Sequence, residues 1–293
     1  MRLLILGSGS NGGVPQWDCN CPRCQAARLN PELRRTRSSV AVELVNRRYL
    51  LLDATPDLYH QLHSAGLHPG GERRESVIEA VLLTHGHGDH CVGLFELSTG
   101  AIFEIPVYGP PDLIEHLFGE EGYFAYLGRL GERYVEPTPL EEGESLELPG
   151  GLRAEGFEVP HTDRLEDGSY RPSRTYGYEV EGDGGRLLYI PDIEALTEGV
   201  LRRMEDADLV LLDGTFWWED ELLRVSGIDV SSTALGHVPI ERSLETLRDV
   251  DVGRVIYTHI NHTNPLLDPG SRMLGELRRA GFDLAYDGQV IAL

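Results

Sequence analysis

The 293-residue sequence predicts an α/β protein with one domain, residues 1–293, in which two β-sheets lie face to face and helices cover their outer faces. In each half of the chain, apolar runs with the length of buried strands come first and strand–helix units follow, a pattern that two packed sheets satisfy. Strand after strand ends in His or Asp, and the carboxyl ends of strands are where α/β folds collect ligands. We therefore expect an αββα four-layer sandwich with a functional site at one edge of its sheets.

The composition excludes several classes of partner and catalyst. The chain has 48 acidic and 26 basic residues, which gives a formal net charge of -22. This charge argues against a nucleic-acid or membrane partner, because nucleic acids and anionic membranes attract proteins with surplus cations. Bound divalent metal would offset part of the acidity. All 26 basic residues are arginine, so a Schiff-base lysine and a P-loop lysine are excluded.

The sequence also bears on the compartment. The first apolar run, Leu3–Leu6, is too short for a signal peptide, and no stretch of about 18 apolar residues occurs. We therefore expect a cytoplasmic protein. In a reducing compartment, the crowding of Cys19, Cys21 and Cys24 favours metal binding over a disulfide.

The amino-terminal loop, about residues 7–37, follows a first strand at Leu3–Leu6. Its glycine-rich start lacks the GxGxxG spacing of a dinucleotide site. Cys19, Cys21 and Cys24 then offer three thiolates that can face one tetrahedral zinc, so a fourth ligand has to come from elsewhere in the chain. The alternative is that these cysteines are small buried hydrophobic residues. The polar character of the segment favours a structural zinc knuckle.

A hairpin and a helix are predicted next. Strands at 38–43 and 48–53 alternate in character, and the second strand ends at Asp53. Thr55 is predicted to cap a helix that runs to about Leu67. The histidines of that region are expected at the surface rather than at a metal: His60, His63 and His68.

The densest group of candidate ligands follows the apolar run Val77–Leu83, which has the length and β-branched content of a buried strand. This run leads into His85-Gly86-His87-Gly88-Asp89-His90. The glycines give the backbone the freedom to turn His85 and His87 toward a common point. Imidazole nitrogen and carboxylate oxygen suit Zn, Fe or Mn. A polar loop with incidental histidines is the alternative, but such a density of ligands after a strand has little structural purpose.

Later strands end in residues of the same kinds. We expect a helix at 112–118 and strands at 105–108, 145–148, 152–159, 176–181, 186–190, 209–212 and 254–257. The candidate ligands that follow these strands are His161, Asp192, Asp213 and His259. The segment 119–139 is rich in aromatic and acidic residues, and it could form a lid or an oligomer contact, such as that of a homodimer.

The HxHxDH pattern from His85 to His90, followed by isolated His161, Asp192 and His259, resembles the metallo-β-lactamase superfamily over nearly the whole chain. The resemblance implies the metallo-β-lactamase fold and a dinuclear metal site. One metal would be bound by His85, His87 and His161, the other by Asp89, His90 and His259, and Asp192 would bridge them. Two such metals can hold a shared hydroxide, which Asp89 would orient, and can stabilise charge on a phosphoryl or acyl oxygen.

The same resemblance suggests roles for residues around the metals. His237 corresponds to a histidine that many hydrolases of the superfamily place opposite the metals, where it could protonate a leaving group. A structural hydrogen bond at a helix start is the alternative for His237. Asp53 and Asp213 are expected to orient metal-binding imidazoles.

Three further residues each have two possible roles. Trp217 and Trp218 could form a wall of the substrate pocket, or they could be core or interface residues. Cys91, next to His90, is expected to be a buried packing residue, with a weak additional metal ligand as the alternative.

Within the superfamily, the chain resembles the family of pyrroloquinoline quinone biosynthesis protein B, PqqB. The segments that carry this resemblance are 13–17 with 19–21, 53–57, 213–217, 259–261 with 263–265, and 285–288. A second relative is the family of PhnP-type cyclic phosphodiesterases, which shares the cysteine cluster and a Thr-His-Ile-x-His ending. Members of the PqqB family usually carry a degraded HxHxDH motif and commonly have Asn in the place of His262. Both departures of this chain from that pattern point toward a hydrolase.

The resemblance to the phosphodiesterases implies that His262 supplies the fourth ligand of the cysteine zinc. Cys19, Cys21, Cys24 and His262 would form a closed Cys₃His site, which is structural because no position stays open for a substrate. His262 follows His259 closely in the sequence, so this zinc would hold the amino-terminal loop beside the dinuclear centre.

Three functions are compatible with these patterns. The first is a dinuclear metal-dependent hydrolase of a small-molecule phosphodiester, with two active-site divalent ions (Zn, Mn or Fe) and one structural Zn. The second is a PqqB-like role in pyrroloquinoline quinone biosynthesis, for which the resemblance implies iron-dependent oxidation of a tyrosine-derived precursor. The third, a non-enzymatic metal carrier, is disfavoured by the complete ligand set. We expect a small-molecule or short peptide substrate.

Overall fold

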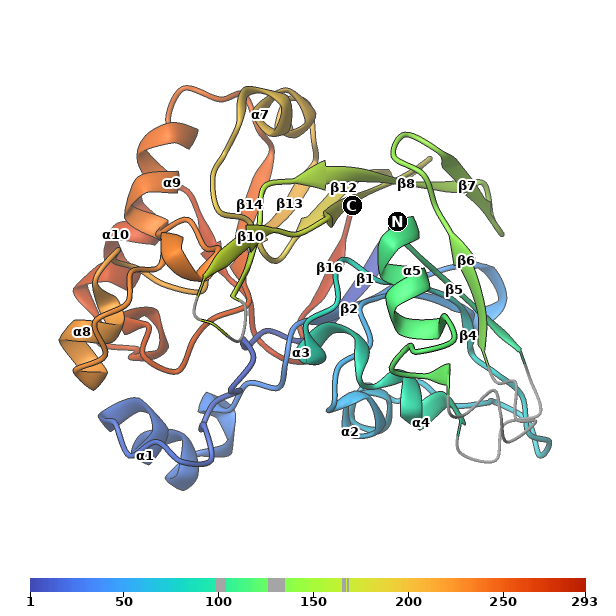
Figure 1. Ribbon diagram of the computed structural model, residues 1–293, viewed down its shortest axis with the longest axis horizontal. Helices are drawn as coiled ribbons and strands as arrows, with labels where there is room; N and C mark the ends of the chain where they lie inside the picture. The colour runs from blue at the N-terminus through green and yellow to red at the C-terminus, as the bar shows by residue number, and fades with distance from the viewer. Residues whose placement is uncertain (99–103, 126–134, 165–166, 168) are drawn as a thin grey trace.

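The structure is a computed structural model that describes residues 1–98, 104–125, 135–164, 167 and 169–293. Two mixed β-sheets lie face to face, and helices cover the outer face of each sheet (Figure 1). The predicted α/β class and the αββα layers are therefore confirmed. None of the described helices is long and apolar enough to cross a lipid bilayer.

The first sheet has seven strands in the order β16-β1-β2-β3-β4-β5-β6. Pairing is antiparallel from β16 to β3 and parallel from β3 to β6. The strands are β1 (Arg2–Gly7), β2 (Ser39–Glu43), β3 (Tyr49–Leu52), β4 (Ile78–Leu82), β5 (Ile105–Gly109), β6 (Val135–Pro139) and β16 (Val290–Ala292).

The second sheet also has seven strands, in the order β15-β14-β13-β12-β11-β8-β7, and a separate two-stranded sheet pairs β9 with β10. Pairing is parallel from β15 to β12 and antiparallel from β12 to β7. The strands are β7 (Ser145–Leu148), β8 (Leu152–Val159), β9 (Thr162–Arg164), β10 (Tyr170–Pro172), β11 (Thr175–Gly182), β12 (Gly185–Ile190), β13 (Leu209–Asp213), β14 (Arg254–Thr258) and β15 (Asp283–Leu284).

The helices pack in two outer layers. Those that carry core side chains against the first sheet are α2 (Leu58–Ser64), α4 (Leu94–Ser98) and α5 (Pro111–Phe118). Those against the second sheet are α7 (Glu198–Met204), α9 (Ile240–Leu247) and α10 (Arg272–Arg279). The remaining helices and 3₁₀ turns are α1 (Pro22–Leu29), α3 (Gly88–Cys91), α8 (Glu221–Ser226), η1 (Pro31–Leu33), η2 (Val45–Arg47), η3 (Thr233–Leu235) and η4 (Pro265–Leu267).

Side-chain alternation along the strands explains the layers. On β13, Leu209 and Leu211 point into the core between the sheets, whereas Val210 and Leu212 point into the core under the helices. Because successive strand residues face opposite sides, a fully apolar strand can serve two cores at once. Each such buried side chain contributes about 1.5–3 kcal/mol to folding.

One detail differs from the sequence-based expectations. Thr55 was predicted to cap the helix now seen as α2, but that helix begins at Leu58 after Asp57. The Thr55 hydroxyl instead accepts a hydrogen bond from the Asp57 backbone N–H at 3.1 Å, which forms a turn before the helix. The carboxylate of Asp57 pairs with Arg37 and does not cap α2.

The segment 119–139, predicted as a lid or an oligomer contact, is divided in the structure. Residues 126–134 lie outside the described residues, so that prediction stays open for them. On one side of them, Phe124 is buried and its ring packs 5.3 Å from that of Phe118. On the other side, residues 135–139 form the edge strand β6. These flanking parts belong to the fold itself.

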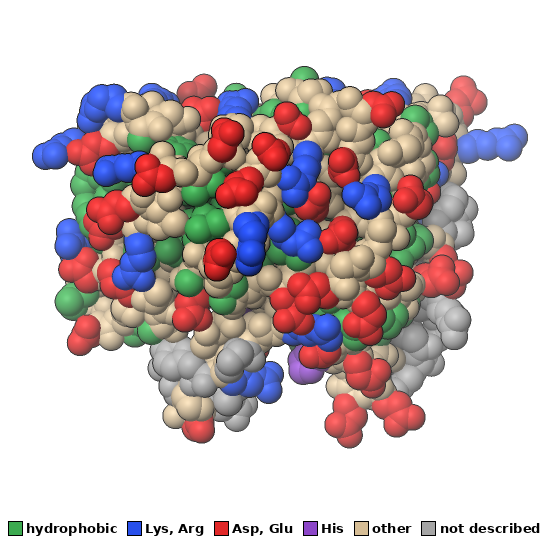
Figure 2. All heavy atoms as spheres, turned by 90° about the horizontal axis from the view of Figure 1, so that it is seen from above, with side chains coloured by type: hydrophobic (Ala, Val, Ile, Leu, Met, Phe, Trp, Pro, Cys, Tyr) green, Lys and Arg blue, Asp and Glu red, His purple; other side chains and the backbone are tan. Residues whose placement is uncertain are grey.

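Figure 2 shows how the charged side chains are distributed over one face of the molecule. Acidic side chains and arginines are interspersed over the face seen in Figure 2. A nucleic-acid site normally gathers cationic side chains in one patch or stripe. On the face in view the arginines lie among acidic side chains, and the absence of a nucleic-acid partner stays a prediction from the sequence.

Replacing Leu211 by Ala tests the core between the two sheets. Leu211 is fully buried there, so its truncation should lower the free energy of unfolding by about 2–5 kcal/mol, measured by urea unfolding. Leu29→Ala is the control, because Leu29 is 88% exposed and its truncation should lower the free energy of unfolding far less. Equal losses for the two variants would show that the inter-sheet packing is not as described.

Candidate metal centres

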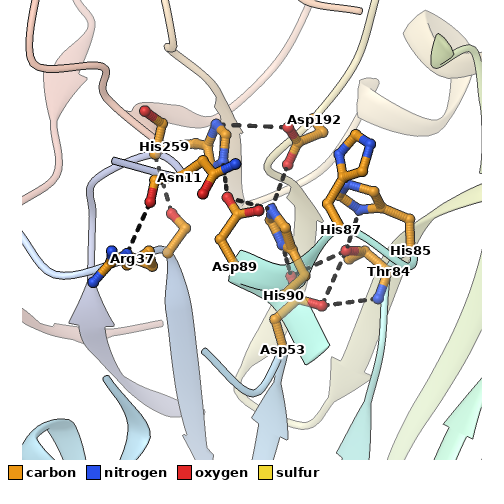
Figure 3. A network of polar contacts seen from close by, with 12 residues as sticks. Asn11, Arg37, Asp53, Thr84, His85, His87, Asp89, His90, Asp192 and His259 are labelled. Atoms are coloured by element: carbon orange, nitrogen blue, oxygen red, sulfur yellow. Dashed lines mark hydrogen bonds and ion pairs between the residues drawn. The ribbon is translucent and has the colours of Figure 1, made fainter. Parts of the chain in front are cut away.

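The candidate site lies where strands of both sheets end at one edge. The segment after β4 supplies His85 and His87, and α3 supplies Asp89 and His90. The other candidate ligands follow β8, β12 and β14: His161, Asp192 and His259. Strands that end at one edge bring distant parts of the sequence together, and Figure 3 shows Asp89, His90, Asp192 and His259 converging beside His85 and His87.

The first predicted group, His85, His87 and His161, is brought together. Their ligand atoms lie within 4.8 Å of one another. His85 Nε2 lies 2.9 Å from His87 Nδ1, and the Nδ1–H of His161 donates to the Gly236 carbonyl at 3.0 Å. The Nε2 atom of His161 is thereby left for a ligand.

The second predicted group, Asp89, His90 and His259, is also brought together within 4.8 Å. Asp89 Oδ2 lies 3.2 Å from His259 Nε2 and 3.4 Å from His90 Nε2. Asp192 lies between the two groups. One of its oxygens is 3.1 Å from His90 Nε2 and the other is 3.6 Å from His259 Nδ1, and it also forms a ligand group with His85 and His90. Asp192 thus lies near ligand atoms of both predicted groups, and its bridging role stays a prediction.

Buried polar atoms in this cluster fit a metal ion. His161 Nε2 is buried without a hydrogen-bond partner among the described residues, and the buried atoms His90 Nε2 and Asp192 Oδ2 face each other at 3.1 Å without a well-aligned hydrogen bond. A buried polar atom without a partner costs about 1–3 kcal/mol. Coordination of divalent metal would satisfy all three atoms, so the donor set fits the implied ions.

The charges of the cluster lead to the same conclusion. Burial raises the pKa of Asp192, but His259 and His90 outweigh it and hold the pKa well below its ordinary range. Asp89 behaves in the same way beside His90 and His259. Burial lowers the pKa of His90, yet Asp89, Asp192 and Asp53 raise it well above its usual value. These carboxylates therefore require a nearby cation, which a proton on His90 or a divalent ion can provide.

Other imidazoles are held neutral. Burial, together with His90 and His87, lowers the pKa of His85 well below its ordinary value. Burial lowers the pKa of His161 to about 4. A metal ligand has to present a lone pair, so a neutral imidazole is the form that binds metal.

Asp53 orients two of these histidines, as predicted for a residue at the end of β3. It is fully buried and accepts from His90 Nδ1–H at 2.8 Å and from the Thr84 hydroxyl at 3.0 Å. Since the Thr84 hydroxyl donates to Asp53, its oxygen accepts from His85 Nδ1–H at 3.0 Å. Both imidazoles therefore turn Nε2 toward the site. The bridging role of Thr84 was not predicted.

Asp213, at the end of β13, makes the equivalent arrangement in the second sheet. It accepts from His237 Nδ1–H at 2.8 Å and from the Thr215 hydroxyl at 2.6 Å. Thr215 in turn accepts from His259 Nδ1–H at 2.8 Å, which leaves His259 Nε2 facing Asp89. The role of Thr215 was not predicted. Its place two residues after Asp213 indicates a contact with that carboxylate, but its other partner, His259, is distant in the sequence.

Asp163 is a second residue that sequence reasoning missed. It lies on β9, and its Oδ1 is 3.2 Å from His87 Nε2. His87 is the most exposed histidine of the two predicted groups, with 43% of its side chain accessible. Asp163 fixes its Nε2–H and leaves Nδ1 free toward His85. Metal-binding histidines commonly donate their second N–H to a carboxylate in this way.

Cys19, Cys21, Cys24 and His262 also come together within 4.8 Å, as predicted for the zinc knuckle. Cys21 Sγ lies 3.8 Å from His262 Nδ1. Burial raises the pKa of the Cys24 thiol to about 12 and lowers the pKa of His262. The histidine is thus ready to bind as a neutral ligand, and a bound zinc would deprotonate the thiol. Cys24 belongs to α1, which the sequence analysis did not predict.

A buried acidic residue connects the knuckle region to α8. Glu221 is 1% exposed and accepts from the Thr263 hydroxyl and from the Trp217 backbone N–H, both at 2.6 Å. The Asn261 amide donates to Thr263 at 2.6 Å. The residues on both sides of His262 are therefore held by one hydrogen-bond network.

The structure also places the residues whose roles were open. Trp217 is a core residue, and Trp218 packs against the same core with the Arg224 guanidinium 4.6 Å from its ring centroid. Phe216, next to Trp217 in the sequence, lines a cavity beside the metal-ligand cluster. Cys91 is buried, its thiol donates to the His87 carbonyl at 3.4 Å, and burial raises its pKa to about 12, as suits a packing residue. The histidines on and after α2 are exposed, as predicted: His60, His63 and His68.

A cavity of about 940 Å³ opens beside the cluster. It is lined by His87, Asp89, Asp192, His237 and His259 on one side and by the loop of the knuckle on the other. A volume of this order lies in the range of small-molecule binding sites.

Residues 48–260 match the family model of the beta-lactamase superfamily domain. Coenzyme PQQ synthesis protein B of Methylobacterium radiotolerans is 34% identical over 306 residues, and the protein of the same name from Rhodopseudomonas palustris is 32% identical over 317 residues; in both cases 100% of each chain is covered.

Among solved structures, Zn²⁺-bound PqqB from Methylobacterium extorquens has a TM-score of 0.91 and 33% identity, with 100% of both chains covered. A diphosphatase from the PhnP family has a TM-score of 0.71 and 24% identity, with 100% of this chain and 97% of that chain covered. The second likeness concerns the fold alone.

Asp163→Ala tests the support of His87. Without the carboxylate, His87 is free to rotate, so affinity for the metal held with His85 and His161 should fall about 10–100-fold. Competition between the protein and a chelator for Co²⁺ measures it. Asp167→Ala is the control, because Asp167 is an exposed residue of the same segment. Unchanged affinity in Asp163→Ala would contradict the assignment.

Glu221→Gln tests the buried network by its pH dependence. Burial raises the pKa of Glu221 to about 7, so between its ordinary value of 4.5 and about 7 the folded state keeps a proton that the unfolded state releases. The free energy of unfolding should therefore decrease as pH rises through this window, by at most about 3 kcal/mol. The variant should lose less stability over the same range.

Urea unfolding of metal-loaded protein from pH 5.5 to 8 measures this difference. Glu198→Gln is the matched control, because the Glu198 side chain is 85% exposed, and its curve should follow that of the wild type. A Glu221→Gln curve parallel to the wild type would show that Glu221 does not titrate in the folded protein as described.

Proposed function

We infer the function of this chain from the fact that it belongs to the metallo-β-lactamase superfamily and, within it, to the family of coenzyme PQQ synthesis protein B, PqqB. We propose that it is a metal-dependent hydrolase with a dinuclear centre that acts on a small-molecule phosphodiester. One observation carries the proposal: the two ligand groups are complete, and Asp192 lies between them.

The residues that would hold the metals are those brought together at the strand ends. His85, His87 and His161 would bind one ion, Asp89, His90 and His259 the other, and Asp192 both. Bound divalent ions would supply an activated water and stabilise the charge that develops on a phosphoryl oxygen. The cysteine knuckle would hold a third, structural zinc.

The other tasks in the reaction fall to side chains of the chain itself. Asp89 lies beside both His90 and His259, where its carboxylate can orient a water. His237 donates Nδ1–H to Asp213 and lines the cavity, so its Nε2 is the nitrogen available to the substrate. Burial lowers the pKa of His237, but Asp213, Asp192 and Asp89 outweigh it and raise the pKa. The protonated form can then deliver a proton to a leaving alkoxide.

A second candidate is favoured by the full-length similarity to coenzyme PQQ synthesis protein B. In this role the chain would act in the synthesis of that coenzyme, with iron in the centre, and would oxidise a tyrosine-derived small molecule or short peptide. Zinc has no redox chemistry, so the native metal separates the two candidates.

Metal analysis combined with two assays tests the proposal. Protein purified without added metal should contain about three divalent ions per chain. Zinc- or manganese-loaded protein should hydrolyse bis(p-nitrophenyl) phosphate, and Asp192→Ala should reduce turnover at least about a hundredfold because both ions lose a ligand. Asp183→Ala, at an exposed turn, is the control.

The outcomes separate the candidates. Turnover that is lost in Asp192→Ala and kept in Asp183→Ala would support the hydrolase. Iron in the centre, oxygen consumption with a tyrosine-containing peptide and no diesterase activity would favour the role in coenzyme synthesis. Diesterase turnover that persists in Asp192→Ala would refute the dinuclear assignment.

A further inference from the structure

We propose that the wall of the cavity opposite the candidate metal ligands is a binding subsite for an apolar arm of the substrate. The subsite consists of Trp17 on the knuckle loop and of Leu222, Val225 and Ile228 on and just after α8. This inference rests on the proposed function in one respect, since the metal centre would hold the anionic, reacting end of the same molecule.

The cavity joins the two regions without a break. His87, Asp89, Asp192 and His259 line one part of the cavity, while residues 16–21 of the knuckle loop and His262 line another. A substrate whose reacting group lies at the metals therefore extends toward the knuckle. The cysteine site then has a second task, because it shapes a wall of the binding cavity.

The cavity lining combines polar residues of the knuckle loop, such as Gln16, Asp18 and Asn20, with a group of apolar residues. Phe216, Leu222, Val225, Ile228 and Leu235 supply apolar surface to the cavity. Binding sites for small molecules typically combine such apolar walls with a few polar groups that fix orientation. A substrate with an anionic end and an apolar arm matches both parts of this cavity.

Trp17 supports the assignment by its exposure. Its side chain is 87% exposed although it lies at a cavity, and Ile228 of the same cavity is 52% exposed. Clustered exposed apolar side chains mark binding surfaces more often than they serve folding. An indole ring offers a large, flat surface for an apolar group at low entropic cost.

The loop that carries Trp17 is braced despite this exposure. Val14 and Arg35 exchange backbone hydrogen bonds at 2.8 and 2.9 Å, and Arg28 donates to the Gln16 carbonyl at 3.0 Å. The Gln16 side chain donates to Asp18 at 2.7 Å. Trp17 is thus presented at a fixed place, so little ordering entropy would be lost when a ligand packs on it.

Titration calorimetry with two phosphonates tests the subsite. Zinc-loaded wild type should bind 4-phenylbutylphosphonate at least about tenfold more tightly than methylphosphonate, since only the first can reach the apolar wall. Trp17→Ala and Val225→Ser should each remove most of that preference and leave methylphosphonate affinity unchanged. Tyr59→Ala is the control, because Tyr59 is 62% exposed but lies on α2, outside the cavity lining.

The result is independent of catalysis, because phosphonates are not hydrolysed. If the diesterase assay fails but the preference depends on Trp17, the subsite stands and the hydrolase proposal does not. Equal binding of the two phosphonates by wild type, or an undiminished preference in both variants, would overturn the subsite. A concentration-dependent dimer that Trp17→Ala dissolves would also overturn it, since a second copy would then cover this wall.

Discussion

Asp53 and Asp213 are fully buried carboxylates at the ends of β3 and β13, one in each sheet, and the geometry of the site depends on them. Each accepts a hydrogen bond from one histidine directly and from a threonine that accepts from a second histidine. Burying a carboxylate without hydrogen-bond donors costs much free energy, so the folded protein retains these hydrogen bonds. They fix which ring nitrogen of each imidazole carries the proton, and they aim the other nitrogen at the space between the sheets. The two sheets thus contribute matching halves of one centre.

The segment after β14 joins this centre to the knuckle. His259 faces Asp89, and His262 joins the cysteines close by in the sequence. Between them, Asn261 accepts from Ser10 of the amino-terminal loop at 3.2 Å and donates to Thr263, which donates to Glu221. Such a connected network resists independent movement of its members. Because Asn261 and Thr263 flank His262, this network links the cysteine site to Ser10 and to Glu221 of α8. Binding, positioning and structural tasks share a single short stretch of chain.

Much of the centre could be predicted because its signals are local. The HxHxDH pattern, the isolated His161 and Asp192 after strands, and the cysteine spacing are readable from single segments. The contacts that support the ligands are harder to predict from the sequence. Asp163, for example, reaches His87 only when β9 has packed beside the segment that follows β4. The cap at Thr55 failed because a turn competes for the same hydroxyl. β16 was missed because its three residues carry too little periodicity, and only pairing with β1 makes them a strand. The sequence likewise contains no local signal that Trp17 and α8 line the same cavity.

The pairing of β16 with β1 has a consequence for biosynthesis. Antiparallel pairing joins Leu3 to Ile291, and the Met1 amino group donates to the Leu293 carbonyl at 3.1 Å. The strand that completes the first sheet therefore leaves the ribosome after the whole of the second sheet. Until then, β1 has an unpaired edge, which is a template for wrong pairing with other chains. Closure of such distant contacts is also slow. Translation of this protein thus includes an interval in which a chaperone that shields β-edges would protect the nascent chain from aggregation.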